Sequence, residues 1–198
     1  MNEKKVFLIG DPHFGHKNII TYAHRPFKSV ADMHETIIKN WNEKVKGDDK
    51  VFILGDLTFT NQKITTDIIS KLNGIKYLVK GNHDYKPNQW YRDCGIKEVY
   101  DYPILLGRVS SEMYEGYFLL SHEPIGYMPV SLPYINCYAH LHDSKNCVTF
   151  TPGNVCLSME RWNYTPVNFN TILLNLERLH RHLDLAVNDF KKEETNVN

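Results

Sequence analysis

Five short apolar runs are spread along the chain, and Asp, Asn or His side chains follow or close each of them. The runs are VFLIG at 6–10, VFILG at 51–55, YLVKG at 77–81, YFLLS at 117–121 and NCYAHLH at 136–142. Short, near-continuous apolar runs rich in β-branched and aromatic residues are typical of strands covered on both faces. The chain is therefore expected to place further elements on both sides of its sheet.

Helical patterns separate the first three runs. Apolar residues recur at helical spacing within 31–45 and again within 64–74, where Gly74 is suited to end the helix. A third stripe, from Ile172 to Val187 within 170–188, is expected to pack in the core. The first half thus follows a β-α-β-α-β order. This order predicts an α/β fold whose ligands gather beyond the carboxyl ends of the strands.

Length and composition favour one folded domain. Of the 198 residues, 42% are hydrophobic and 23% are charged, a globular balance that argues against disordered, collagen-like and coiled-coil chains. We predict a single domain over residues 1–190 and a polar tail over 191–198. The four cysteines form no C-x-x-C pair and are expected to be free thiols.

Charge and hydropathy bear on partners and location. The 23 basic residues balance the 23 acidic ones, so the formal net charge is zero with neutral histidine. This balance argues against tight binding of a nucleic-acid polymer or an anionic membrane. Apolar stretches fall short of the roughly 18 residues that a transmembrane helix needs, and the N-terminal run is too short for a signal peptide. The expected location is therefore the cytoplasm.

The polar residues at the ends of the runs indicate a metal site. A lone histidine is usually structural, but carboxylate, amide and imidazole groups at five strand ends are hard to explain that way. In Asp11-x-His13 and His140-x-His142, alternate residues lie on one side of an extended chain and can share or straddle ions. Mixed imidazole and carboxylate ligands suit zinc, iron, manganese or nickel, and the set is too large for one tetrahedral ion. Its members are Asp11, His13, Asp56, Asn82, His83, His122, His140 and His142.

The motifs D-x-H, G-D, G-N-H-D, a lone His and H-x-H follow one another in that order between residues 11 and 142. This ordered set resembles the calcineurin-like metallophosphoesterases. HFGHKNII at 13–20, RPF at 25–27 and, more loosely, WNYTPV at 162–167 resemble a small phage and bacterial branch of that family. The resemblance implies a four-layer αββα sandwich and two divalent metal ions. Manganese is the first choice, with iron, zinc or nickel as alternatives.

The resemblance also implies a role for each ligand. Asp11, His13, Asp56 and His142 would hold one ion. Asp56, Asn82, His122 and His140 would hold the other, so that Asp56 bridges the two. His83 would lie beside the ions without binding either.

Two ions about 3.5–4 Å apart clamp a phosphoryl group and lower the pKa of a bound water, and the resulting hydroxide attacks phosphorus in line. The Asp56 carboxylate can give one oxygen to each ion, and Asn82 is a neutral ligand that leaves the site electropositive. His83 can protonate the leaving oxygen. Asp56 and His83 are thus the candidate catalytic residues. Substrate contacts are expected from His16, Arg25, Asn82 and His83, with loop packing as the alternative role of His16.

Two positions depart from the pattern of the family. Many members carry an acidic residue three positions after the bridging Asp, where it orients the His of G-N-H, but this chain has Phe59 there. His83 must then be oriented in another way or act mainly on the phosphate. Ala139 replaces the usual Gly before the H-x-H pair. Because Ala tolerates fewer backbone conformations than Gly, a small local shift is expected.

The motif set predicts a dinuclear, metal-dependent enzyme that hydrolyses a phosphodiester or a phosphomonoester. Its expected partner is a small phosphorylated substrate, with nucleotides among the candidates, and the oligomeric state is left open. A nuclease or oligonucleotide-processing phosphodiesterase would use the same reaction on another partner. A non-catalytic scaffold of the same fold is a further alternative, although no ligand position is lost.

Overall fold

The computed structural model describes residues 4–110, 115–126, 134–145 and 147–195 of the chain. Two five-stranded sheets form its centre. In the first sheet, four neighbouring strands run parallel and a fifth pairs antiparallel with the edge of this group. Its order is β10 (Val167–Asn168), β1 (Val6–Ile9), β2 (Lys50–Leu54), β3 (Ile75–Val79) and β4 (Glu98–Tyr100).

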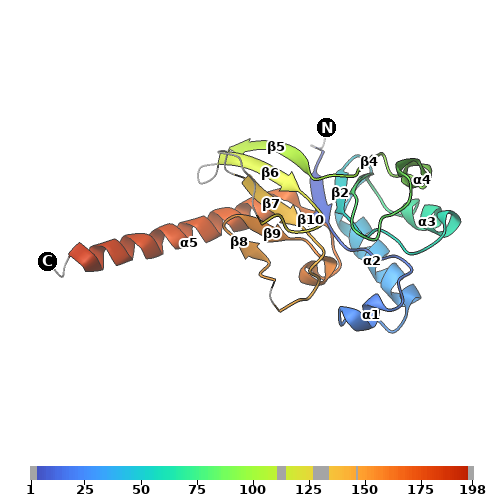
Figure 1. The fold of residues 1–198 in the computed structure, drawn as a ribbon, viewed down its shortest axis with the longest axis horizontal. Coiled ribbons are helices and arrows are strands. Elements are labelled where there is room, and N and C mark those ends of the chain that lie inside the picture. Colours follow the sequence, from blue (N-terminus) through green and yellow to red (C-terminus); the bar gives the residue numbers. More distant parts are fainter. Residues whose placement is uncertain (1–3, 111–114, 127–133, 146, 196–198) are drawn as a thin grey trace.

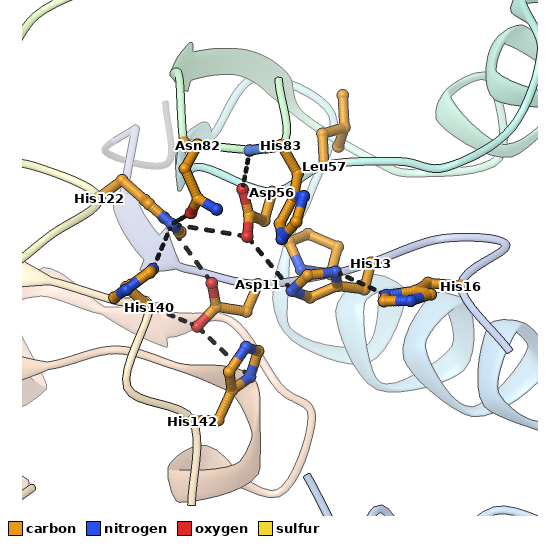
Figure 2. Close-up of polar contacts among 12 residues, drawn as sticks. Asp11, His13, His16, Asp56, Leu57, Asn82, His83, His122, His140 and His142 are labelled. Atoms are coloured by element: carbon orange, nitrogen blue, oxygen red, sulfur yellow. Dashed lines mark hydrogen bonds and ion pairs between the residues drawn. The ribbon is translucent and has the colours of Figure 1, made fainter. Parts of the chain in front are cut away.

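The second sheet has a parallel centre and antiparallel edges. The sheet order is β5 (Ile104–Ser110), β6 (Glu115–Leu120), β7 (Tyr134–Tyr138), β9 (Asn154–Cys156) and β8 (Phe150–Thr151). Two of these strands, β6 and β7, end near the carboxyl edge of the first sheet (Figure 1). The polar side chains that follow them, His122 and His140, lie beside those that follow the strands of the first sheet (Figure 2).

The helices α1 to α4 lie on one side of the first sheet, and the second sheet lies on the other (Figure 1). The Ser29 hydroxyl accepts a hydrogen bond from the Asp32 amide and so caps the second helix, whose Met33, Ile37 and Trp41 are buried. The bounds are α1 (Ile19–Tyr22), α2 (Val30–Lys44), α3 (Gln62–Ile69), α4 (Asn88–Asp93), α5 (Phe169–Thr195) and a 3-10 turn η1 (Met159–Trp162).

Strand β1 shows why its sequence is apolar without alternation. Phe7 and Ile9 pack in the core between the first sheet and the helices, whereas Leu8 packs in the core between the two sheets. Strand β2 divides in the same way, with Ile53 on the helix side and Phe52 on the inter-sheet side. Successive side chains of a strand point to opposite faces, so a strand covered on both faces needs apolar residues at every position. The predicted α/β class with elements on both sides of a sheet is confirmed.

Helix α5 packs by its N-terminal half and then projects from the body of the molecule (Figure 1). Ile172 and Leu176 are buried in the inter-sheet core, but Leu183 is 43% exposed. The predicted core stripe is therefore buried at Ile172 and Leu176 but not at Leu183, and the side chain of Val187 lies outside the described residues. The helix continues through Thr195, so residues 191–195 of the predicted tail are helical. Within the described part of the chain, no helix combines the length and the apolarity that a membrane span requires.

Candidate metal centre

Five loops bring their polar side chains to one place (Figure 2). These loops follow β1, β2, β3, β6 and β7, each at the carboxyl end of its strand. Because parallel strands of one sheet present their carboxyl ends at the same edge, the loops after β1, β2 and β3 meet there. The loops after β6 and β7 reach the same place from the second sheet (Figure 2). The residues brought together are Asp11 and His13 after β1, Asp56 after β2, Asn82 and His83 after β3, His122 after β6, and His140 and His142 after β7.

The backbone of this cluster is unusual. Asp11, His13, Asp56, His140 and His142 all have positive φ, between 47° and 68°. Non-glycine residues rarely adopt this left-handed conformation, and each such residue costs on the order of 1–3 kcal/mol unless its surroundings hold it in place. Strain that gathers at five candidate ligands is typical of a functional site, where the direction of each side chain outweighs the local cost.

One group of ligand atoms comes from Asp11, His13 and His142, which can place one atom each within 4.8 Å of one another. The Asp11 carboxylate is completely buried and lies 3.8 Å from Nδ1 of His142. The His13 ring adds Nε2, which lies 3.5 Å from Oδ2 of Asp56. These residues are the ones that the resemblance assigns to a first ion.

A second group comes from Asp11, Asp56 and His122. Nε2 of His122 lies 3.5 Å from Oδ2 of Asp56, 2.9 Å from Oδ1 of Asn82 and 3.1 Å from Nδ1 of His140. Oδ2 of Asp56 is therefore 3.5 Å from a nitrogen in each group. That position suits a carboxylate oxygen shared between two cations.

The protonation of these groups supports a cation between them. Nδ1 of His122 donates to the carbonyl oxygen of Leu54 at 2.9 Å, which leaves the Nε2 lone pair facing the Asn82 and Asp56 oxygens. Oδ1 of Asp11 and Nε2 of His13 are buried without a hydrogen-bond partner. Buried lone pairs that face one another are costly unless a cation or proton lies between them. The residues present thus fit divalent metal ions.

Burial dominates the electrostatics of this cluster. It raises the pKa of Asp11 to about 6, against the opposing charges of His142 and His122. Burial also lowers the pKa of His13 far below its ordinary value, helped by the nearby charges of His142 and Arg25. A bound dication favours both ionised carboxylates and neutral imidazoles, so it reverses the shift of Asp11 and preserves the neutral form of His13.

Asp84 holds the loop that carries Asp56. Its buried carboxylate accepts hydrogen bonds from the backbone amides of Asp56 at 2.7 Å, Leu57 at 3.1 Å and Gly81 at 2.9 Å. The His83 amide in turn donates to Oδ1 of Asp56 at 3.0 Å, so the β2 and β3 loops are locked together. This fixes the Asp56 carboxylate with Oδ2 directed at the imidazoles.

Arg25 is placed differently from the substrate contact expected of it. It is buried behind the β1 loop, where its guanidinium donates to the carbonyl oxygens of Asp11 at 2.7 Å and Pro12 at 3.2 Å. It also forms an ion pair with Glu160 at 2.8 Å. These acceptors orient the guanidinium toward protein, so Arg25 supports the Asp11 loop from behind.

Glu160, in η1, is a residue that the sequence reasoning missed. Its Oε1 accepts from Nδ1 of His142 at 3.0 Å as well as from Arg25, and its side chain is only 5% exposed. Although burial and the Arg25 charge lower the pKa of His142, the hydrogen bond to Glu160 and the Asp11 charge raise it above its ordinary value. The contact turns Nε2 of His142 away from Glu160, as is usual for a metal-binding histidine. The one available signal was that Glu160 lies just before the WNYTPV stretch.

The remaining predicted residues lie on the His13 side of the cluster. Nδ1 of His16 is 3.3 Å from Nδ1 of His13, and Figure 2 shows His16 beyond His13 on the side away from Asp11. The Phe59 ring stacks on His16 with centroids 4.0 Å apart and lies 5.0 Å from the His83 ring. An aromatic neighbour thus flanks His83, at the position where the resemblance led us to expect an acidic residue.

Ala139 fits the site because of a glycine opposite it. A Cβ built on Gly10 would collide with the Ala139 methyl group. Gly10 therefore leaves room for the methyl group of Ala139. Ala139 itself is fully buried.

Comparisons with known proteins agree with this arrangement. The family model for calcineurin-like phosphoesterases matches residues 4–179. An uncharacterized protein of Methanocaldococcus jannaschii is 32% identical over 185 residues, which cover 90% of this chain and 94% of that protein. The gene 66 protein of Mycobacterium phage D29 is 32% identical over 93 residues, or 45% of this chain and 44% of that protein.

A solved structure shares the fold. The crystal structure of AQ665, a protein of unknown function from Aquifex aeolicus, matches with a TM-score of 0.67 and 25% sequence identity. The match covers 86% of this chain and 98% of that one. With a family model that spans most of the sequence, and with side chains that could hold metal ions gathered at its strand ends, the chain belongs to the calcineurin-like phosphoesterase family.

Proposed function

We propose that this protein is a dinuclear, metal-dependent phosphoesterase that hydrolyses a phosphodiester or a phosphomonoester. The observation that carries the proposal is the position of Asp56, whose Oδ2 lies 3.5 Å from the ring nitrogens of both His13 and His122. One oxygen placed between two groups of ligands suits a pair of ions better than a single one. Membership of a family of metal-dependent hydrolases supports the same reaction.

The ions would supply charge that polarises the phosphoryl group and a water with a pKa low enough to act as nucleophile at neutral pH. The chain supplies the rest. Asn82 contributes a neutral oxygen, so the site keeps positive charge for an anionic substrate. His83 lies beside the cluster, with its ring centroid 5.9 Å from that of His13, and we assign it the proton transfer to the leaving oxygen. Its backbone bond to Asp56 fixes its place relative to the bridging carboxylate.

The substrate we propose is small and phosphorylated, and manganese is the first metal to test, followed by iron, zinc and nickel. A cavity of ≈ 260 Å³ adjoins the cluster on the side of Asn82 and His122. Its wall includes Lys80, Tyr102 and Glu123, so it offers both polar and aromatic surface. The balanced formal charge supports a small substrate over a long polyanion, and we propose a cytoplasmic location.

The test is hydrolysis of p-nitrophenyl phosphate and bis(p-nitrophenyl) phosphate by the manganese-loaded protein, with Asp56→Asn alongside. Removing the shared carboxylate charge is expected to lower kcat/KM by at least about 100-fold, equivalent to ~2.7 kcal/mol of transition-state stabilisation. Elemental analysis of both proteins reports the metal content. Equal rates for the two proteins with manganese, nickel, zinc and iron would reject the proposal. Stoichiometric binding of a partner by protein that contains no metal would instead favour the alternative hypothesis of a non-catalytic scaffold.

A further inference from the structure

Phe59 places an aromatic ring at the edge of the candidate metal centre, and the ring is partly exposed to solvent. Phe59 is 40% exposed although it lies next to a cluster of charged and polar groups. A single exposed apolar side chain is common in soluble proteins and needs no explanation. Phe59 is different because it belongs to a group of rings that begins at the candidate metal centre.

The rings are in contact with one another. Phe59 stacks on His16 with centroids 4.0 Å apart and planes 21° from parallel. The same ring is nearly parallel to the candidate ligand His13, with centroids 5.4 Å apart and an interplanar angle of 20°. Tyr22, which is 68% exposed, meets His16 edge-on at 6.4 Å. Phe59 is therefore a partly exposed ring that stacks on a candidate metal ligand.

The loop that carries Phe59 is held in place. The Phe59 amide donates to the carbonyl oxygen of Phe14 at 2.8 Å, which ties this loop to the one that bears His13. In the same loop, the Thr58 hydroxyl bonds to the Phe14 carbonyl at 3.2 Å and to the Thr60 hydroxyl at 3.0 Å. A loop fixed in this way loses little conformational entropy when a ligand stacks on its aromatic side chain.

We propose that Phe59 and His16 form a subsite for a planar aromatic group of the substrate, such as a nucleobase, when its phosphate lies at the metal centre. The inference rests on the proposed function and narrows its substrate class to phosphate esters that carry an aromatic ring. Stacked or edge-on rings with centroids about 4.5–7 Å apart attract one another beyond the gain from apolar burial. Stacking tolerates any base because every base has a π-face.

Two ligands that differ only in the base test the subsite. They are the phosphonate analogues of AMP and of ribose 5-phosphate, in which CH₂ replaces the ester oxygen so that neither can be hydrolysed. Calorimetry on the manganese-loaded protein gives both dissociation constants without any need for turnover. We expect the AMP analogue to bind about tenfold more tightly, the amount that the weaker base–aromatic stacks contribute.

Variants at position 59 separate the ring from its bulk. Phe59→Leu is expected to bring the ratio of the two dissociation constants to about one, and Phe59→Tyr is expected to keep the ratio of the unaltered protein. Tyr102→Leu is the matched control, since Tyr102 is an exposed aromatic on the Asn82 side of the centre.

Equal affinities of the two ligands for the unaltered protein would overturn the subsite and leave the phosphoesterase proposal untouched. A preference that survives Phe59→Leu but is lost in Tyr102→Leu would also overturn it, because the base would then lie in the cavity beside Asn82. Absence of binding by either ligand would overturn it as well. The hydrolysis assay with Asp56→Asn decides separately whether the metal centre is catalytic.

Discussion

Replacing Glu160 by Gln is a sharp test of how the metal centre is held. Oε1 of Glu160 accepts hydrogen bonds from Nε of Arg25 at 2.8 Å and from Nδ1 of His142 at 3.0 Å, and it forms an ion pair with Nη2 of Arg25 at 2.8 Å. Glutamine keeps the size and one carbonyl oxygen, but it removes the charge opposite a buried guanidinium. It also places an NH₂ group where Oε2 of Glu160 is buried without a hydrogen-bond partner. The change therefore weakens the ion pair and leaves a buried donor to satisfy.

The two effects have different magnitudes and different readouts. Removing one charge of a buried ion pair costs about 3–5 kcal/mol, so the free energy of unfolding of the metal-free protein should fall by roughly that amount. Loss of the carboxylate that orients a metal-binding histidine typically weakens metal affinity about 10- to 100-fold. We expect the manganese dissociation constant of Glu160→Gln to rise within that range.

The assay is a manganese titration by calorimetry together with urea denaturation of the metal-free protein. Glu98→Gln is the matched control, because Glu98 pairs with Arg92 on the surface, where the two side chains are 43% and 38% exposed. Exposed pairs contribute less than about 1 kcal/mol, so this control should change neither measurement appreciably. Manganese affinity of Glu160→Gln equal to that of the unaltered protein would refute the claim that Glu160 orients His142.

Two further predictions concern the same centre. Because burial raises the pKa of Asp11 to about 6, this carboxyl must release a proton before it binds metal, so manganese affinity should rise about fivefold between pH 5 and pH 6. Calorimetry at a series of pH values that finds no slope would contradict this. Gly55 has a φ of +80°, and a Cβ there would collide with the His122 ring. Gly55→Ala should therefore lower the free energy of unfolding by at least about 2 kcal/mol and weaken manganese binding. Gly153→Ala, where nothing lies within 4 Å of the added methyl, is the control that should behave as the unaltered protein in both urea and manganese titrations.

The first half of the fold could be predicted because its signals are local. The apolar runs at 6–10, 51–55 and 77–81 correspond to β1, β2 and β3, and the helical patterns between them to α2 and α3. Periodicity shows these elements directly, since burial on one face or on both faces determines the pattern of apolar residues. Strands β8 and β10 could not be found in this way. Each has two residues and is defined only by pairing with a neighbour, as Phe7 pairs with Asn168.

The candidate ligands could be named for a related reason. Once β1, β2 and β3 are parallel neighbours in one sheet, the residues that follow them meet at one edge, so the pattern of strands is enough to group Asp11, Asp56 and Asn82. His122 follows β6 in the second sheet, so its place beside them depends on how the two sheets pack. The positive φ of Asp11 and Asp56 has no such signal, because the sequence there shows ordinary residues and the strain is imposed by the converging loops.

The amino-acid sequence alone determines which chemical groups are available and which strand ends carry them, because the strands and the residues that follow them are visible in short-range spacing. Only the packed molecule decides what supports those groups. Arg25 and Glu160 are 135 residues apart in sequence, yet they contact each other in the fold. Arg25, which was expected to contact substrate, instead donates to the Asp11 carbonyl, and Glu160 accepts from Nδ1 of His142. The stacking of Phe59 on His16 is likewise a product of two loops held together by tertiary hydrogen bonds. Such contacts arise from the relative placement of whole elements, which local periodicity does not encode.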